Sequence, residues 1–138
     1  MRKGILAFLG LTQTERSRRE GLSLRTRDRL AEVEADIRTA QSYTEWEFYR
    51  LGSLCAEKNV PRSTALVSLT EVLAQCEAIR AQVQQNRDHL ETRGPSKRLV
   101  AQLDELKLMS FQLQSYAQKV SVVIEQDLLD YPQPEDDS

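Results

Sequence analysis

The chain has 138 residues, the length of a single domain, and 40% of them are apolar while 29% are charged. This balance excludes both a disordered chain and a membrane protein. Residues 1–30 carry eight Lys/Arg and three Asp/Glu, a local charge of +5, whereas the rest of the chain carries −7. Such a split favours a basic N-terminal arm that reaches either for an anionic surface or for acidic parts of its own oligomer.

Residues 1–21 are the predicted arm. Its uncharged run from Gly4 to Thr14 is about half of the ~20 residues that a membrane span requires, and an Arg-rich stretch follows. Apolar residues backed by basic ones are typical of segments that bind an anionic membrane peripherally, and they also fit a groove on a partner protein. A targeting segment is the third alternative. The residues expected to make these contacts are Ile5, Leu6, Phe8, Leu9, Arg16, Arg18 and Arg19.

The first long helix is expected over residues 22–58, and residues 59–61 end it because Pro61 disfavours helix in the residue before it. Its apolar seam consists of Leu30, Val33, Ile37, Ala40, Thr44, Phe48, Leu51 and Cys55. Trp46 and Tyr49 lie behind this seam on a helical wheel, and Tyr43 lies on its flank. Aromatic residues are enriched at interfaces, so we expect a partner or self-association site here. The alternatives are that the arm folds back and covers them, or that they are simply exposed.

The second helix is expected over residues 63–92, with Ser63 as its N-cap and Gly94-Pro95 as its stop. From Ala65 to Leu90 its apolar positions are spaced alternately by four and three residues, which keeps one stripe facing a partner helix. Asn86 is the polar exception in this register. It is either solvated near the end of the bundle or paired with a second Asn that sets register and oligomeric state.

The third helix is expected over residues 97–130, with Ser96 as its cap and an acidic, disordered tail at 132–138 after it. Its seam consists of Leu99, Leu103, Leu106, Leu113, Ala117, Val120, Ile124 and Leu128. A second apolar stripe, about 140° from the seam, contains Val100, Leu108, Phe111, Val122 and Leu129. A helix that is apolar on two faces packs between neighbours, so this stripe predicts a homodimer or a stable complex. Scattered surface apolar residues are the alternative.

Together these elements predict an all-α fold. Residues 22–131 are expected to form an elongated antiparallel bundle of three long helices with coiled-coil-like packing, because short connections make neighbouring helices antiparallel. The bundle is expected to be oligomeric. No alternating pattern typical of strands competes with this interpretation.

The sequence contains no motif for catalysis, cofactor binding or metal binding. His89 is the only histidine, the glycines are isolated, and neither H-E-x-x-H nor C-x-x-C occurs. Cys55 and Cys76 fall on apolar faces and are interpreted as buried, reduced thiols, which fits the cytoplasm. We therefore expect no catalytic residues, no cofactor, no metal and no small-molecule substrate.

The leading interpretation is a non-enzymatic helical assembly or adaptor protein that self-associates or binds a helical partner. It would be cytoplasmic or peripherally bound to a membrane, with the arm as a tether to a membrane surface or a larger complex. A nucleic-acid-associated protein that uses the arginines of the arm is the second interpretation, although a pI of about 5.5 is low for it. A small helical chaperone or regulator that sequesters a partner protein is the third.

Overall fold

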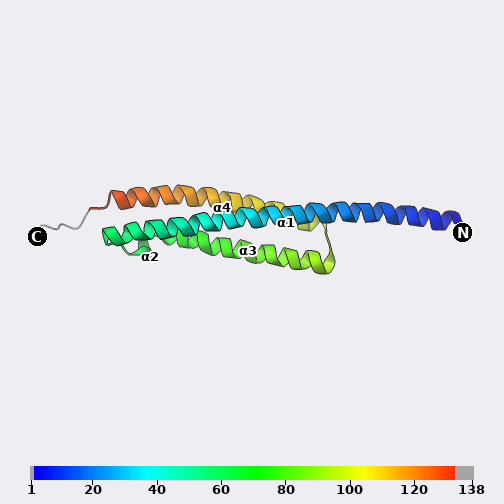
Figure 1. The fold of residues 1–138 in the computed structure, drawn as a ribbon, viewed down its shortest axis with the longest axis horizontal. Helices are drawn as coiled ribbons and strands as arrows, with labels where there is room; N and C mark the ends of the chain where they lie inside the picture. The colour runs from blue at the N-terminus through cyan, green and yellow to red at the C-terminus, as the bar shows by residue number, and fades with distance from the viewer. Residues whose placement is uncertain (1, 133–138) are drawn as a thin grey trace, which may run out of the picture.

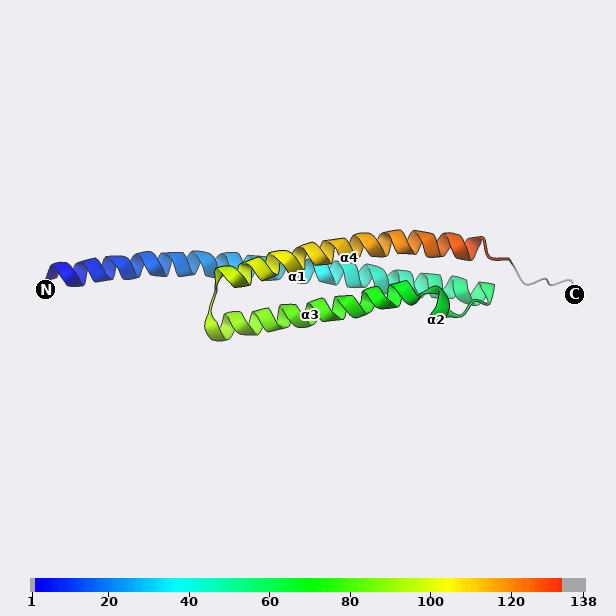
Figure 2. The same ribbon diagram turned by 180° about the vertical axis from the view of Figure 1, so that it is seen from behind.

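The computed structural model describes the backbone of residues 2–132 and the side chains of residues 17–132. This part of the chain is all-helical, as predicted, and contains α1 (Arg2–Lys58), α2 (Arg62–Ala65), α3 (Val67–Arg93) and α4 (Lys97–Leu129) (Figure 1). The three long helices lie side by side, and α3 runs in the opposite direction to α1 and α4 (Figures 1 and 2). The expected count of three is wrong for the described residues, because a short separate helix precedes α3. Apart from Pro132, the residues of the expected acidic tail lie outside the described part of the chain.

The first helix begins at Arg2, so the expected start at residue 22 is wrong. Gly21 lies inside α1, where a glycine costs only about 1 kcal/mol relative to alanine. That penalty is too small to interrupt a helix with no proline on either side. The first part of α1 extends past the ends of α3 and α4, so the predicted arm is a helical projection from the bundle (Figures 1 and 2).

The end of α1 is a Schellman turn, in the place where the sequence predicts the helix to stop. Asn59 has a positive φ of 57°. The Val60 N–H donates to the Cys55 carbonyl at 2.9 Å, and the Asn59 N–H donates to the Ala56 carbonyl at 3.3 Å. Asparagine tolerates the left-handed conformation that this cap requires.

The start of the second long helix differs from the expected one. Pro61, with φ −64°, leads directly into α2, so Ser63 lies inside that short helix and caps nothing. Leu66, with φ −106°, separates α2 from α3. Its side chain is fully buried in a cluster with residues of α1 and α4, which explains why the chain bends here. Arg62 fastens α2 to α1 by donating from Nε to the Gly52 carbonyl at 3.3 Å.

The turn between α3 and α4 confirms two sequence predictions. Gly94 ends α3 with a positive φ of 82°, and its N–H donates to the Leu90 carbonyl at 3.0 Å. Ser96 caps α4, since its hydroxyl oxygen accepts from the Leu99 N–H at 3.1 Å. Glycine suits position 94 because it adopts a positive φ without steric cost. Serine suits the N-cap because its side-chain oxygen accepts a hydrogen bond from a backbone N–H of the first turn.

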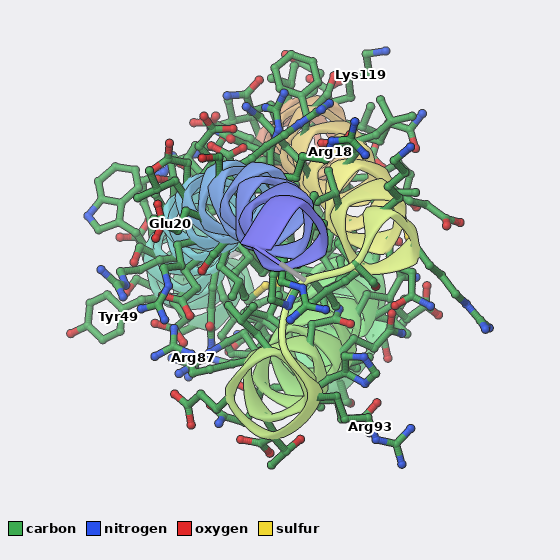
Figure 3. The ribbon with its side chains drawn as sticks, turned by 90° about the vertical axis from the view of Figure 1, so that its right-hand side faces the viewer. Arg18, Glu20, Tyr49, Arg87, Arg93 and Lys119 are labelled. Carbon is green, nitrogen blue, oxygen red and sulfur yellow. The ribbon has the colours of Figure 1, made fainter. Side chains whose placement is uncertain are left out.

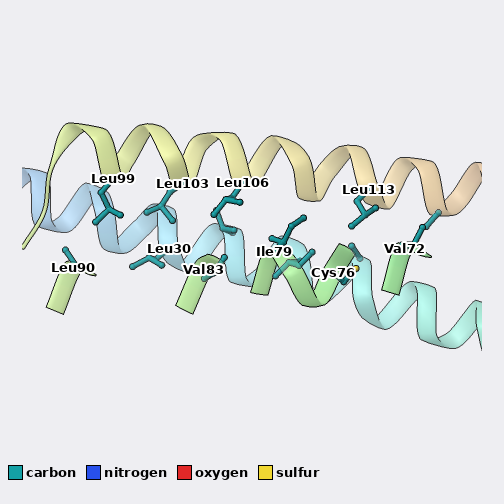
Figure 4. Close-up of a cluster of buried hydrophobic side chains, with 14 residues drawn as sticks. Leu30, Val72, Cys76, Ile79, Val83, Leu90, Leu99, Leu103, Leu106 and Leu113 are labelled. Atoms are coloured by element: carbon teal, nitrogen blue, oxygen red, sulfur yellow. The ribbon is translucent and has the colours of Figure 1, made fainter. Parts of the chain in front are cut away.

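The core consists of two apolar clusters that the three long helices share. The larger cluster lies nearer the turn between α3 and α4, and Figure 4 shows how side chains from all three helices meet in it. The smaller cluster lies nearer α2 and includes Leu51, Leu66 and Ile124. Between the two clusters, along α1 and α4, lie the buried polar residues Thr44, Glu47 and Ser121.

Ion pairs fix the register in which α1 and α4 run side by side. In each pair the two residues are 75 positions apart in sequence. The pairs are Arg29 Nε with Asp104 Oδ1 at 3.0 Å, Lys107 Nζ with Glu32 Oε2 at 2.7 Å, and Arg50 Nη1 with Glu125 Oε1 at 2.8 Å. Because the same offset recurs near both ends of the contact, the two helices are held without a shift along their axes.

Glu47 is the buried carboxylate of this contact, with 4% of its surface exposed. Arg50 donates to it from Nη2 at 2.7 Å, and the hydroxyl of Ser121 on α4 also donates to it. A buried charge is tolerated only when it is paired and hydrogen-bonded, and these two donors supply both conditions. Sequence reasoning missed Glu47 because it lies beside the apolar seam rather than in it.

Replacing Glu47→Ala should lower the free energy of unfolding by about 2 to 3 kcal/mol, because it leaves Arg50 and Ser121 without their shared acceptor. Urea unfolding followed by circular dichroism measures this. Glu57→Ala, on an exposed position of the same helix, is the matched control and should change stability by less than about 0.5 kcal/mol. Equal effects of the two substitutions would contradict a structural role for the buried carboxylate.

Candidate protein-interaction surface

The candidate site is the outer face of α4, the side turned away from α1 and α3. Four residues of the predicted second stripe lie there with more than half of their surface exposed. They are Leu108 at 56%, Phe111 at 68%, Val122 at 67% and Leu129 at 53%. The inner seam of the same helix is buried from Leu99 to Leu128, except for Val120, which is partly buried. α4 therefore packs with one side and presents apolar side chains on the other.

Three further exposed apolar residues on α4 were not predicted. Met109, Tyr116 and Val123 follow one another at intervals of seven residues. That interval returns to nearly the same side of a helix, so the residues share the other edge of the outer face. Their seven-residue spacing is visible in the sequence. The predicted stripe follows eleven-residue steps, which lie along the opposite edge of the outer face, so it omits these three residues.

Val100 does not belong to the outer face, and its assignment to the second stripe is wrong. It is buried, with 5% of its surface exposed. The ion pair between Arg29 and Asp104 places Val100, four residues earlier on α4, level with Arg25 of α1, which is next in sequence to the buried Thr26. Val100 therefore lies on the edge of α4 that packs against α1, together with Asp104 and Lys107, and not on the outer face.

The aromatic residues of α1 divide into two groups. Trp46 and Tyr49 are exposed, and Figure 3 shows Tyr49 pointing away from the bundle. The guanidinium carbon of Arg50 lies 5.7 Å from the centre of the Trp46 ring, a cation–π contact. Tyr43 instead packs, partly buried, against the larger core cluster. The alternative in which the arm folds back over Trp46 and Tyr49 is wrong, because α1 is a continuous helix from Arg2.

The remaining predicted residues lie away from the outer face of α4. Arg18 and Arg19 are exposed on the projecting part of α1. Asn86 is half-buried on α3, so it is neither a fully enclosed polar residue nor a freely solvated one. The side chains of the other predicted arm residues lie outside the described ones: Ile5, Leu6, Phe8, Leu9 and Arg16.

A groove of about 670 Å³ lies between α1 and α3. Its lining is dominated by polar side chains that already bind one another. Gln41 donates from Nε2 to Glu77 at 2.8 Å and accepts from Arg80 at 3.1 Å, and Arg87 pairs with Glu34. These contacts join the two helices, so the groove is explained by packing rather than by a ligand.

The surface ion pairs shift the pKa values of their carboxylates. Hydrogen bonds from Lys107 and Arg29 hold the pKa of Glu32 below its ordinary value of 4.5, and the hydrogen bond from Arg50 does the same for the pKa of Glu125. The hydrogen bonds to Glu125 and Glu47 raise the pKa of Arg50. These charges are therefore all present at neutral pH.

The cysteines do not form a reactive site. Both are free and buried, as predicted. Burial raises the pKa of the Cys76 thiol to about 11 and also raises that of Cys55, so the nucleophilic thiolate is scarce at neutral pH. Among the described residues, no group of three or more His, Cys, Asp or Glu could hold a metal ion. Within the same residues, no helix is both long and apolar enough to cross a bilayer.

Comparison with known proteins gives no relative from which a role could be transferred. No protein family, no curated protein and no solved structure matches this chain. The inference of function therefore depends on the surface of the chain itself.

Acid should destabilise the fold through Glu32 and Glu125. Their pKa values are depressed in the folded state, so below about pH 4.5 the unfolded chain takes up protons first and the free energy of unfolding falls with pH. Urea unfolding between about pH 7 and about pH 3 measures the decline. It should be shallower in a Glu32→Gln, Glu125→Gln variant than in a control with Glu57→Gln and Glu91→Gln, both exposed. Identical declines would contradict the assignment.

Proposed function

We propose that the protein is a non-enzymatic helical assembly protein that binds another protein helix with the outer face of α4. The supporting observation is that seven large apolar side chains are exposed along this one helix while its opposite side fills the core. Contiguous apolar patches on a protein surface mark interaction sites. Phenylalanine, tyrosine and methionine, which contribute to this patch, are also enriched at interfaces.

A helix is the partner that best fits this surface. α4 has 33 residues, which corresponds to a length of about 50 Å. Its exposed apolar residues extend from Leu108 to Leu129, over about six turns, rather than gathering around one pocket. A partner helix that lies along α4 reaches residues on successive turns, the usual pattern of helix recognition.

Phe111→Glu together with Val122→Glu should abolish assembly, because two carboxylates would have to be desolvated in the interface. Sedimentation velocity at tens of micromolar should give a mass above that of one chain for the wild type and the mass of one chain for the variant. Circular dichroism should show unchanged helicity, since both residues are exposed.

Leu24→Glu together with Val67→Glu is the matched control, because both residues are exposed apolar residues outside α4. This variant should assemble like the wild type. A wild type that sediments as a single chain at these concentrations would contradict the proposed assembly. An equal loss of assembly in the control variant would assign it to general surface charge rather than to α4.

The projecting part of α1 supports a second role, as a tether to an anionic membrane surface. In this role the basic residues Arg18 and Arg19 would face the lipid headgroups, each contributing about 1 kcal/mol. Both residues are exposed, so a surface could reach them without disturbing the core.

Arg18→Gln together with Arg19→Gln should weaken binding to vesicles that contain phosphatidylserine by roughly 30-fold, the equivalent of about 2 kcal/mol. Vesicle co-sedimentation measures this, with Arg38→Gln and Arg93→Gln as the control of equal charge. Equal binding to vesicles of phosphatidylcholine alone would contradict an electrostatic tether.

A further inference from the structure

Nine exposed residues form one straight stripe along the middle of the outer face of α4. Their spacing repeats as four, four and three residues, an eleven-residue period that follows the helix axis closely. At about 100° per residue the nine positions stay within an arc of about 120°. Figure 3 shows one of them, Lys119, pointing outward from the bundle. The stripe consists of Lys97, Ala101, Glu105, Leu108, Gln112, Tyr116, Lys119, Val123 and Asp127.

This stripe is complementary to itself when it is read backwards. Gln112 is its centre, and residues at equal distances on either side of Gln112 are suited to contact one another. Two such pairs have opposite charges: Lys97 with Asp127, and Glu105 with Lys119. The other two are apolar: Ala101 with Val123, and Leu108 with Tyr116. A two-fold interface requires this pattern, since each residue of one copy must suit the residue that faces it on the other.

The four charges of the stripe have no partners within the described part of the chain. None of Lys97, Glu105, Lys119 and Asp127 takes part in an ion pair, although the charges on the edge facing α1 do. The first turn of α4 contains no acidic residue and its last turn no basic residue. Lys97 at the start and Asp127 near the end therefore oppose the helix dipole. An antiparallel neighbour would bring an opposite charge to each end.

We propose that the helix bound by the outer face of α4 is α4 of a second copy of this chain. The two helices lie antiparallel across a two-fold axis at Gln112. This inference rests on the proposed function and names its partner. Each ionic and apolar pair of the stripe then occurs twice, and Phe111 and Val122 flank the contact on the side of α1. Stable dimers bury about 800 Å² on each partner, and a helix face about 50 Å long offers an area of that order.

The antiparallel arrangement places the two N-terminal projections at opposite ends of the dimer. The register between α1 and α4 puts Gln112 level with Ile37, so Arg2 lies about 50 Å from the axis along the helix. The two projections therefore end about 100 Å apart. The dimer is a rod with one basic N-terminal segment at each of its two ends.

Charge reversal tests the pairing between Glu105 and Lys119 directly. Glu105→Lys should weaken the dimer at least tenfold in sedimentation equilibrium, because it places two pairs of lysines opposite each other, and Lys119→Glu should do the same with carboxylates. The double variant Glu105→Lys, Lys119→Glu should recover an affinity within about threefold of the wild type, since each pair is restored with its signs exchanged.

That recovery occurs only if residue 105 of one copy faces residue 119 of the other. A matched control exchanges charges that lie on the edge of α4 facing α1, with Asp104→Lys and Lys107→Glu. Each of its single variants should lower the free energy of unfolding, because it breaks an ion pair within one chain. The dissociation constant of the dimer, measured on folded protein, should stay within about threefold of the wild-type value. A double stripe variant that stays as weak as its single variants would overturn the antiparallel pairing.

Gln112→Cys provides a second readout that does not depend on affinity. Two copies of the residue meet at the two-fold axis, so oxidised glutathione should produce a disulfide-linked dimer within the assembled protein. The native cysteines are buried and should stay silent. Gln85→Cys, an exposed position on α3, is the control and should not cross-link. A dimeric wild type whose double charge variant stays weak and whose residue 112 does not cross-link overturns this inference alone, whereas a wild type that sediments as a single chain also contradicts the assembly tested for the proposed function.

Discussion

The fixed register between α1 and α4 determines which surfaces of this protein are covered and which are free. Ion pairs with one common offset, together with the buried carboxylate of Glu47, hold the two helices side by side. α3 then closes the core from the third side. With this register set, the apolar seam of α4 points inward, and its outer face is turned away from α1 and α3. A shift along the axes would break every one of these polar contacts at once.

Local signals in the sequence predicted the helix ends well where one residue decides the conformation. Ser96, Gly94 and the turn at Asn59 are such positions, and the apolar seams follow from helical periodicity. The start of α1 could not be predicted, because Gly21 lowers helix stability without forbidding a helix. The burial of Val100 depends on which edge of α4 packs against α1, and the helical wheel of α4 alone does not reveal this. Glu47 depends on Ser121, a partner 74 residues away, which no local pattern reveals.

The outer face of α4 was predicted only in part, and the reason is geometric. The stripe predicted from apolar residues contains Leu108, Phe111, Val122 and Leu129 but none of the charged positions between them. The self-complementary stripe about Gln112 becomes recognisable only when the structure establishes which positions are exposed and which charges already have partners. Helix-end charges that oppose the dipole then gain a physical explanation, because a second antiparallel α4 would neutralise them. The proposed dimer, with its two projecting α1 segments, would be a rod with a basic segment at each end.

The most direct test of this account is the distance between single spin labels on α4, measured by double electron–electron resonance in the assembled protein. Labels at residue 112 should lie close together, within about 20 Å, because two packed helices are about 10 Å apart. Labels at residue 98 should lie about 40 Å apart, because each is fourteen residues from the axis. Equal distances at the two positions would mean parallel pairing, and the absence of dipolar coupling at both would mean that α4 does not meet a second copy. Either result would contradict the account.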